Sequence, residues 1–187
     1  MLALIDETVP SLGSSLAYCL VGCIFLGQLE DIEDRARLLT RDRLREFHWH
    51  REGPVMREAI RELIRGQEFM SWGLVSVCGR RGQSRARARC LQRLLSLLVD
   101  EGVESIVIEK RTTSQDVEDM RVVKETLAQL GASHIKVSWE GKTCRALCIP
   151  DAVAGALADH LLDRDPLGIS RGLLSDVGIT EPIWVPQ

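Results

Sequence analysis

Residues 2–8 read Leu-Ala-Leu-Ile-Asp-Glu-Thr, and this stretch decides the fold that we expect. Its apolar residues are followed by two acids and then by a turn sequence, Val-Pro-Ser-Leu-Gly, at 9–13. A run of this kind predicts a buried strand that ends with Asp6 and Glu7 at the rim of the core. A carboxylate placed there costs stability unless a partner offsets its charge, and a divalent cation is one such partner. The alternative is that the two acids end the strand in solvent.

The segment that follows the turn, residues 16–26, reads LAYCLVGCIFL. Its aromatic and β-branched residues predict a central strand that pairs with the first strand in a hairpin. Further along, the residue patterns predict strands at 47–50, 69–78, 104–109, 134–140 and 145–149, and helices at 29–39, 54–66, 84–101, 114–130 and 150–162. Ser114 is expected to cap one of these helices, and Pro150 is expected to open another.

This order of elements predicts one α/β domain over residues 1–163, with a mixed sheet flanked by helices. Residues 164–187 contain several Pro and Gly and show no clear period, so we expect a C-terminal arm or cap. Such an arm, through Trp184, would allow a homo-oligomer to form by exchange between neighbours.

Composition narrows the class of protein. A net charge of -3 argues against a surface that binds polyanions everywhere, although local basic patches remain compatible with it. The six cysteines form no C-x-x-C pair and mostly lie in apolar stretches, which is typical of buried thiols in a reducing compartment. No basic leader precedes the first strand, and no apolar run reaches membrane-spanning length. We therefore expect a cytoplasmic protein without a membrane partner.

Three acids occupy equivalent kinds of position in this scheme. Asp6 ends the first strand, Glu109 ends a later buried strand, and Asp151 lies at the start of the last long helix. Strand ends of a sheet with parallel neighbours meet at one edge, where such folds place their sites. Three acids there would repel one another unless a cation lay between them. Carboxylate oxygens select Mg²⁺ or Mn²⁺, so these residues are candidate ligands for one or two ions, and Asp119 is a secondary candidate.

These motifs, in this order, resemble the RNase H-like superfamily and, within it, a bacterial family of domains of unknown function. The resemblance rests on Ile5-Asp6-Glu7-Thr8, on Ile106-Val107-Ile108-Glu109, and on Asp151-Ala152-Val153-Ala154-Gly155. It implies an RNase H-like fold whose clustered acids hold two metal ions for phosphodiester cleavage. Thr8 stands where the family has Ser, and Glu109 stands where it has Asp. A non-catalytic descendant is therefore the alternative.

Two histidines, His48 and His50, lie two residues apart, which would place them on one face of the strand expected at 47–50. There they could ligate a metal or transfer a proton beside Asp6. The alternative is a solvated or hydrogen-bonded pair at a sheet edge.

Arginines dominate the segment 79–99, which contains no acid. Arg85, Arg89 and Arg93 repeat every four residues and so form one ridge on the expected helix, with Arg81 just before it. Such a ridge can neutralise the phosphates of RNA or DNA, or it can be an ordinary solvated face.

The sequence thus predicts a divalent-metal-dependent nuclease or phosphodiesterase. Asp6, Glu109 and Asp151 would be its metal ligands, and Glu7, His48 and His50 would assist catalysis. The first alternative is a catalytically inactive RNase H-like module that binds nucleic acid or a partner protein. A self-assembling structural subunit is the second.

Overall fold

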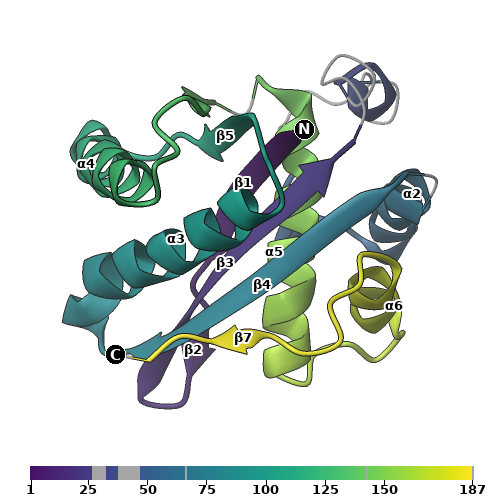
Figure 1. Ribbon diagram of the computed structural model, residues 1–187. Helices are drawn as coiled ribbons and strands as arrows, with labels where there is room; N and C mark the ends of the chain where they lie inside the picture. The colour runs from purple at the N-terminus through teal and green to yellow at the C-terminus, as the bar shows by residue number, and fades with distance from the viewer. Residues whose placement is uncertain (27–32, 38–46, 66, 142, 187) are drawn as a thin grey trace.

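The computed structural model describes residues 1–26, 33–37, 47–65, 67–141 and 143–186. Within these ranges the strands form one mixed seven-stranded sheet in the order β6-β5-β1-β3-β4-β7, with β2 paired to β3 (Figure 1). The strands are β1 (Leu2–Thr8), β2 (Ser11–Leu12), β3 (Ser15–Phe25), β4 (Phe69–Cys78), β5 (Ser105–Glu109), β6 (Lys136–Glu140) and β7 (Ile183–Trp184).

Strand direction decides where the acids meet. β1 is antiparallel to β3, as the predicted hairpin requires, and parallel to β5 on its other side. β5 is in turn parallel to β6, and β3 is antiparallel to β4. The carboxyl ends of β1 and β5, which carry Asp6 and Glu109, therefore lie side by side at one edge of the sheet. The prediction of an α/β domain with a mixed sheet is confirmed.

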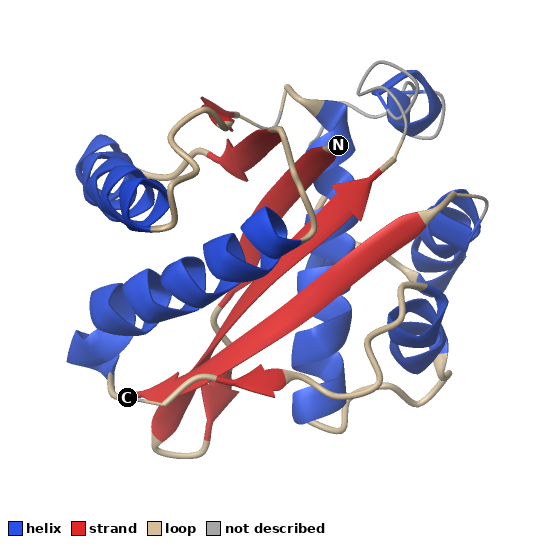
Figure 2. Ribbon diagram, viewed as in Figure 1, coloured by secondary structure: helices blue, strands red, loops and turns tan. Residues whose placement is uncertain are grey.

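Helices cover both faces of the sheet (Figure 2). They are α2 (Pro54–Arg65), α3 (Gln83–Asp100), α4 (Thr113–Gln129), α5 (Cys148–Leu161) and α6 (Ile169–Asp176). One hydrophobic cluster joins the sheet to α2, α5 and α6, and the other joins its opposite face to α3 and α4. No helix in the described ranges is long and apolar enough to cross a membrane.

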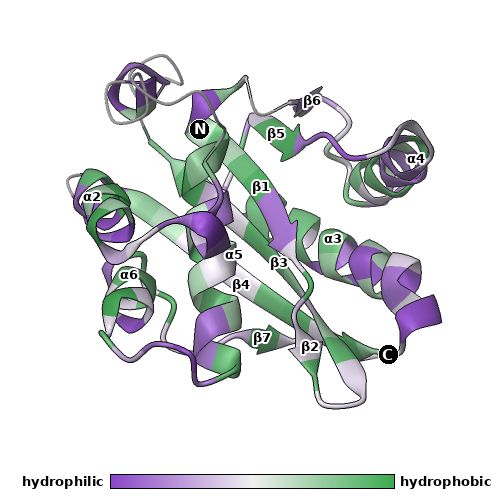
Figure 3. Ribbon diagram, turned by 180° about the vertical axis from the view of Figure 1, so that it is seen from behind, coloured by the Kyte–Doolittle hydropathy of each residue, from purple (hydrophilic) through white to green (hydrophobic). Residues whose placement is uncertain are grey.

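Side chains alternate between these two layers along β1. Leu4 belongs to the cluster on the α5 side and Ile5 to the cluster on the α3 side, as the two-residue period of a strand requires. In Figure 3, β1 is hydrophobic along its length and becomes hydrophilic at its end. Close packing leaves no room for a side chain at Gly155 of α5, since an added Cβ would lie 2.5 Å from the ring of Trp49. Trp49 is fully buried there.

Three local predictions are wrong. Residues 47–50 form no strand; they lead into the 3₁₀ turn η1 (Trp49–Arg51), because the indole of Trp49 packs into the core against α5. Residues 145–149 are also helical, with the 3₁₀ turn η3 (Arg145–Leu147) running into α5. Helix α5 therefore begins two residues before Pro150, which still lies in the first turn, where its missing N–H costs no hydrogen bond. Helix α4 is capped by Thr112, through a capping box with Gln115, rather than by Ser114.

The expected helix at 29–39 lies largely outside the described residues; the part that is described, 33–37, is helical. The C-terminal stretch contains a helix and a strand that its sequence pattern did not predict. Helix α6 contributes Leu173 and Leu174 to the core, and β7 pairs in parallel with β4. The division at residue 163 stays a prediction. All six cysteines are free thiols, and five of them are buried.

Candidate functional site

One open pocket of about 390 Å³ lies where β1, β5, η1 and the start of α5 meet. It brings together all six residues that the sequence suggested for catalysis. The pocket is lined by Asp6, Glu7, Thr8, His48, Trp49, His50, Arg51, Glu109, Lys110 and Asp151.

Asp6 is the most buried acid of this pocket, with 3% of its surface exposed. Burial raises the pKa of its carboxyl group well above 3.8, and a hydrogen bond with Glu109 and the negative charges of Glu109, Asp151 and Glu7 raise it further. Two carboxyl groups can share a hydrogen bond only if one of them carries a proton. The backbone N–H of Glu7 also donates to Asp6 Oδ1 at 2.7 Å, which fixes the orientation of the side chain.

Asp151 approaches the pocket from the first turn of α5, where the positive end of the helix dipole favours an anion. His48 lies beside it, with 3.7 Å between His48 Nδ1 and Asp151 Oδ2. Both side chains are partly exposed to the pocket. An imidazole at this distance can hold or release a proton next to the carboxylate.

The donor set of the pocket fits a divalent cation of the magnesium class. Asp6, Glu109 and Asp151 offer only hard carboxylate oxygens, and their mutual repulsion is the kind that a cation relieves. Among the described residues, however, no three His, Cys, Asp or Glu side chains are arranged as a formed metal site. The three acids share a pocket rather than a completed coordination shell, and burial and like charges hold the pKa of Asp6 above its ordinary value there.

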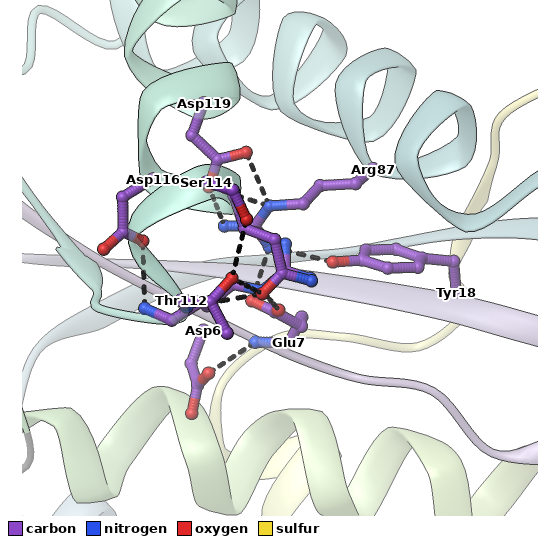
Figure 4. Close-up of polar contacts among 10 residues, drawn as sticks. Asp6, Glu7, Tyr18, Arg87, Thr112, Ser114, Asp116 and Asp119 are labelled. Atoms are coloured by element: carbon purple, nitrogen blue, oxygen red, sulfur yellow. Dashed lines mark hydrogen bonds and ion pairs between the residues drawn. The ribbon is translucent and has the colours of Figure 1, made fainter.

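Glu7 takes a different place from its neighbour. Its carboxylate lies on the side of the sheet that α3 and α4 cover, where Arg87 Nη1 donates to it (Figure 4). Arg111 Nε also lies 2.8 Å from Glu7 Oε1. The sequence suggested Glu7 as an assisting group, and the structure places it between two guanidinium groups. This pairing balances the charge of Glu7 at the rim of the acidic pocket.

Arg87 belongs to the arginine-rich segment but is buried, with 2% of its surface exposed. Its guanidinium donates to both oxygens of Asp119, at 2.8 and 2.9 Å from Nε, and to the hydroxyl of Tyr18 at 2.8 Å (Figure 4). Asp119 is therefore an ion-pair partner rather than a secondary metal ligand. A signal for this was present in the sequence: Arg87 is four residues before Leu91, on the apolar face of α3 rather than on the ridge.

His50 faces a second acid, away from Asp151. Its Nδ1 lies 3.7 Å from Oδ1 of Asp159, an acid that is 5% exposed. Asp159 Oδ2 also accepts hydrogen bonds from Trp49 Nε1 at 2.8 Å and Ser170 Oγ at 3.0 Å. Burial lowers the pKa of His50 although Asp159 opposes this effect. The two histidines are thus divided between two carboxylates, and the prediction that they share one strand face is wrong.

The arginine ridge of α3 is partly accessible. Arg85 and Arg93 are exposed, as is Arg81 in the 3₁₀ turn η2 (Arg80–Gly82) just before the helix. Arg89 is half-buried and donates to the backbone carbonyl of Pro186 at 2.9 Å. Three of the four suggested phosphate-binding residues are therefore exposed on this side of the molecule, and the fourth holds the C-terminal segment.

Comparisons of the chain with protein-family models, with curated proteins and with solved structures found no match. The chemistry of the pocket is therefore the basis on which a function can be argued.

Proposed function

We propose that this protein is a divalent-metal-dependent nuclease or phosphodiesterase with an RNase H-like architecture. The observation that carries the proposal is the meeting of Asp6, Glu109 and Asp151 at one pocket, from two strand ends and a helix start. The raised pKa of Asp6 supports it, because the neighbouring acids contribute to that shift. The mixed sheet with an antiparallel hairpin at its centre is the arrangement that the resemblance implied.

In this proposal the three carboxylates hold one or two Mg²⁺ or Mn²⁺ ions. Bound there, the metal would polarise a phosphate oxygen and lower the pKa of the attacking water. The Glu7 backbone N–H orients Asp6, and His48 Nδ1, at 3.7 Å from Asp151 Oδ2, can exchange a proton there. Lys110 lines the same pocket and adds positive charge that favours a phosphate over a neutral substrate.

The exposed arginines favour a polyanionic substrate, RNA or DNA. Arg81, Arg85 and Arg93 can neutralise phosphates of a bound strand, and each phosphate contact contributes to the salt dependence of binding. Because phosphate contacts carry no sequence information, this surface supports a broad rather than a sequence-specific preference.

The experiment is a cleavage assay on single-stranded and duplex RNA and DNA, with Mn²⁺ and with EDTA. We expect cleavage that requires the metal and that Asp6→Asn abolishes, while nucleic-acid binding stays equal or becomes tighter because a negative charge near the phosphate is removed. Arg121→Ala is the matched control, since Arg121 lies on α4 and pairs with Glu125, one turn further along the same helix. Cleavage that persists in EDTA or in Asp6→Asn would refute the proposal.

The second candidate is an inactive RNase H-like module that binds nucleic acid or a partner protein. What favours it is that the acids in the described part of the chain form no completed metal site, whereas the α3 arginines are already exposed. A wild-type protein that binds the oligonucleotides and cuts none of them would favour this candidate.

A further inference from the structure

A second pocket of about 610 Å³ adjoins the acidic pocket, and the two share Thr8 and His50. The acidic pocket gathers carboxylates, whereas this one gathers donors and cations. It is lined by Thr8, Val9, Pro10, Ser11, His50, Arg57, Asp159, Leu162 and Arg164.

The charge of this pocket is positive on balance. Arg57 and Arg164 contribute two positive charges, and Asp159 is the one acid in the lining. Asp159 Oδ2 is already engaged by Trp49, Ser170 and Arg57 Nη1, the last at 3.2 Å. Both arginines act on His50, since their charges oppose its protonation. The pocket therefore offers an anion two guanidinium groups, an imidazole and the hydroxyls of Thr8 and Ser11.

Arg57 is held rigidly for such a role. Its guanidinium carbon lies 4.8 Å from the ring centroid of Trp49, and its Nε donates to the Trp49 carbonyl at 3.1 Å. With Asp159 on Nη1, three contacts fix the side chain before any ligand arrives. Fixing a binding group in advance removes the entropic cost of ordering it in the complex.

Arg164 follows the turn that ends α5. Asp163 has a φ of 52°, and it is the one residue other than glycine with a positive φ in the described part of the chain. A left-handed residue just past the last turn is a common way to end a helix, and Asp adopts this conformation more readily than most residues. The backbone N–H of Arg164 then donates to the Asp159 carbonyl at 2.8 Å, while its side chain is exposed.

We propose that this second pocket binds a backbone phosphate of the same nucleic-acid strand whose phosphodiester enters the acidic pocket. The inference rests on the proposed function for the identity of the strand. Phosphates recur at regular spacing along a strand, so two contiguous pockets, one suited to metal-assisted cleavage and one suited to an anion, can hold neighbouring phosphates. Arg57, Arg164 and His50 would fix the position of the strand, since phosphate contacts set register without reading sequence.

The test measures binding without cleavage, by fluorescence anisotropy in EDTA. The probes are oligonucleotides about six nucleotides long, which limits sliding along the strand. Each carries one neutral methylphosphonate linkage, moved through the strand position by position. We expect one position at which the neutral linkage weakens binding by about tenfold in the wild type. Arg164→Ala should weaken binding of the unmodified strand to a similar extent, lower the salt slope by about one unit, and remove the effect of that position.

Arg57→Lys keeps a charge but loses the planar contacts of the guanidinium, and we expect the same loss of positional sensitivity. Arg121→Ala is the control, and thermal melting checks that each variant folds. Binding by Arg164→Ala and Arg57→Lys that matches the control would overturn the inference, and so would a wild type that binds no strand or shows no sensitive position. A wild type with a sensitive position that cuts nothing would refute the nuclease and leave this phosphate site standing. If the wild type cleaves the strand but the two arginine variants bind it as the control does, the nuclease stands and the phosphate site is refuted.

Discussion

Asp6 and Glu7 are consecutive residues of β1, yet their carboxylates lie on opposite faces of the sheet and in opposite electrostatic surroundings. Asp6 meets Glu109 and Asp151 on the α5 side, where burial and like charges raise its pKa. Glu7 meets Arg87 and Arg111 on the α3 side (Figure 4). The alternation of a strand is sufficient to separate the two roles.

This relationship predicts opposite effects of two conservative substitutions on stability. At a pH high enough to ionise Asp6, Asp6→Asn should stabilise the protein by on the order of 1–3 kcal/mol, because it removes a buried charge and its amide can donate to Glu109. Glu7→Gln should destabilise it by about 1–3 kcal/mol, because it breaks charged hydrogen bonds. Urea unfolding of the two variants beside the wild type measures both effects. Stability changes of the same sign in the two variants would contradict the structure.

The pH dependence of the Asp6 effect follows from the direction of its shift. The folded protein binds the Asp6 proton more tightly than the unfolded chain does, so protonation of Asp6 stabilises the folded state. This contribution to stability is complete below about pH 3.8. It is lost as the pH rises through the higher pKa of the folded state. Asp6→Asn cannot ionise, so its advantage over the wild type should grow with pH across this range and vanish at the acid end.

Arg87 should be among the most sensitive positions in the molecule. Arg87→Met leaves Asp119 and Glu7 without their main cation in a buried setting, and we expect a loss of about 3–5 kcal/mol in the free energy of unfolding. The double variant Arg87→Met, Asp119→Leu should recover part of this loss, since it removes the stranded charge. Arg85→Ala, on the exposed ridge of the same helix, is the control and should change stability by less than about 0.5 kcal/mol. Equal losses at Arg87 and Arg85 would contradict the buried ion pair.

Local sequence patterns predicted the two acid-terminated strands well. Asp6 and Glu109 both follow continuous apolar runs, Leu2–Ile5 and Ile106–Ile108, as expected of strands buried on both faces. The existence of each strand depends only on residues near one another in the chain. Their adjacency was expected from the rule that parallel neighbours bring their carboxyl ends to the same edge.

Where the sequence pattern failed, a contact with a distant residue decides the structure. Trp49 resembles a strand residue, but its packing against Gly155 and its hydrogen bond to Asp159 come from a helix about a hundred residues further along. The pocket that contains Arg57 and Arg164 escaped prediction for the same reason, since no local pattern joins these two residues. Arg87 lies within the arginine-rich segment but off the ridge, and its helical spacing from Leu91, rather than its charge, is what indicates that it is buried.

The two histidines should contribute unequally to the proposed reaction. His48 lies beside Asp151, so His48→Ala should lower the cleavage rate by about 10²-fold, the usual scale of a general acid or base. His50 pairs with Asp159 instead, and His50→Ala should act mainly on substrate binding. Steady-state kinetics separates the effects, as kcat for His48→Ala and as KM for His50→Ala. If either histidine variant loses as much cleavage activity as Asp6→Asn does, that histidine is essential for catalysis.

Metal binding should compete with protonation of Asp6, whose pKa burial and the neighbouring acids raise. Mn²⁺ binding should therefore release protons, and its affinity should rise with pH through the raised pKa of Asp6. Calorimetric titration in two buffers of different ionisation enthalpy measures the number of protons released. Asp6→Asn should abolish both the release and most of the affinity, whereas Glu7→Gln should retain them. An affinity that does not change with pH would contradict the raised pKa of Asp6.

The most direct test of the central claim is a crystal structure of the protein soaked in Mn²⁺, with anomalous differences recorded at a wavelength where manganese scatters strongly. We expect an anomalous peak between the carboxylates of Asp6, Glu109 and Asp151, with ligand distances of about 2.1 Å. Two peaks about 4 Å apart would indicate a two-metal centre. A map without a peak in this pocket, at a manganese concentration that saturates binding in solution, would contradict the claim that these three acids form a metal centre.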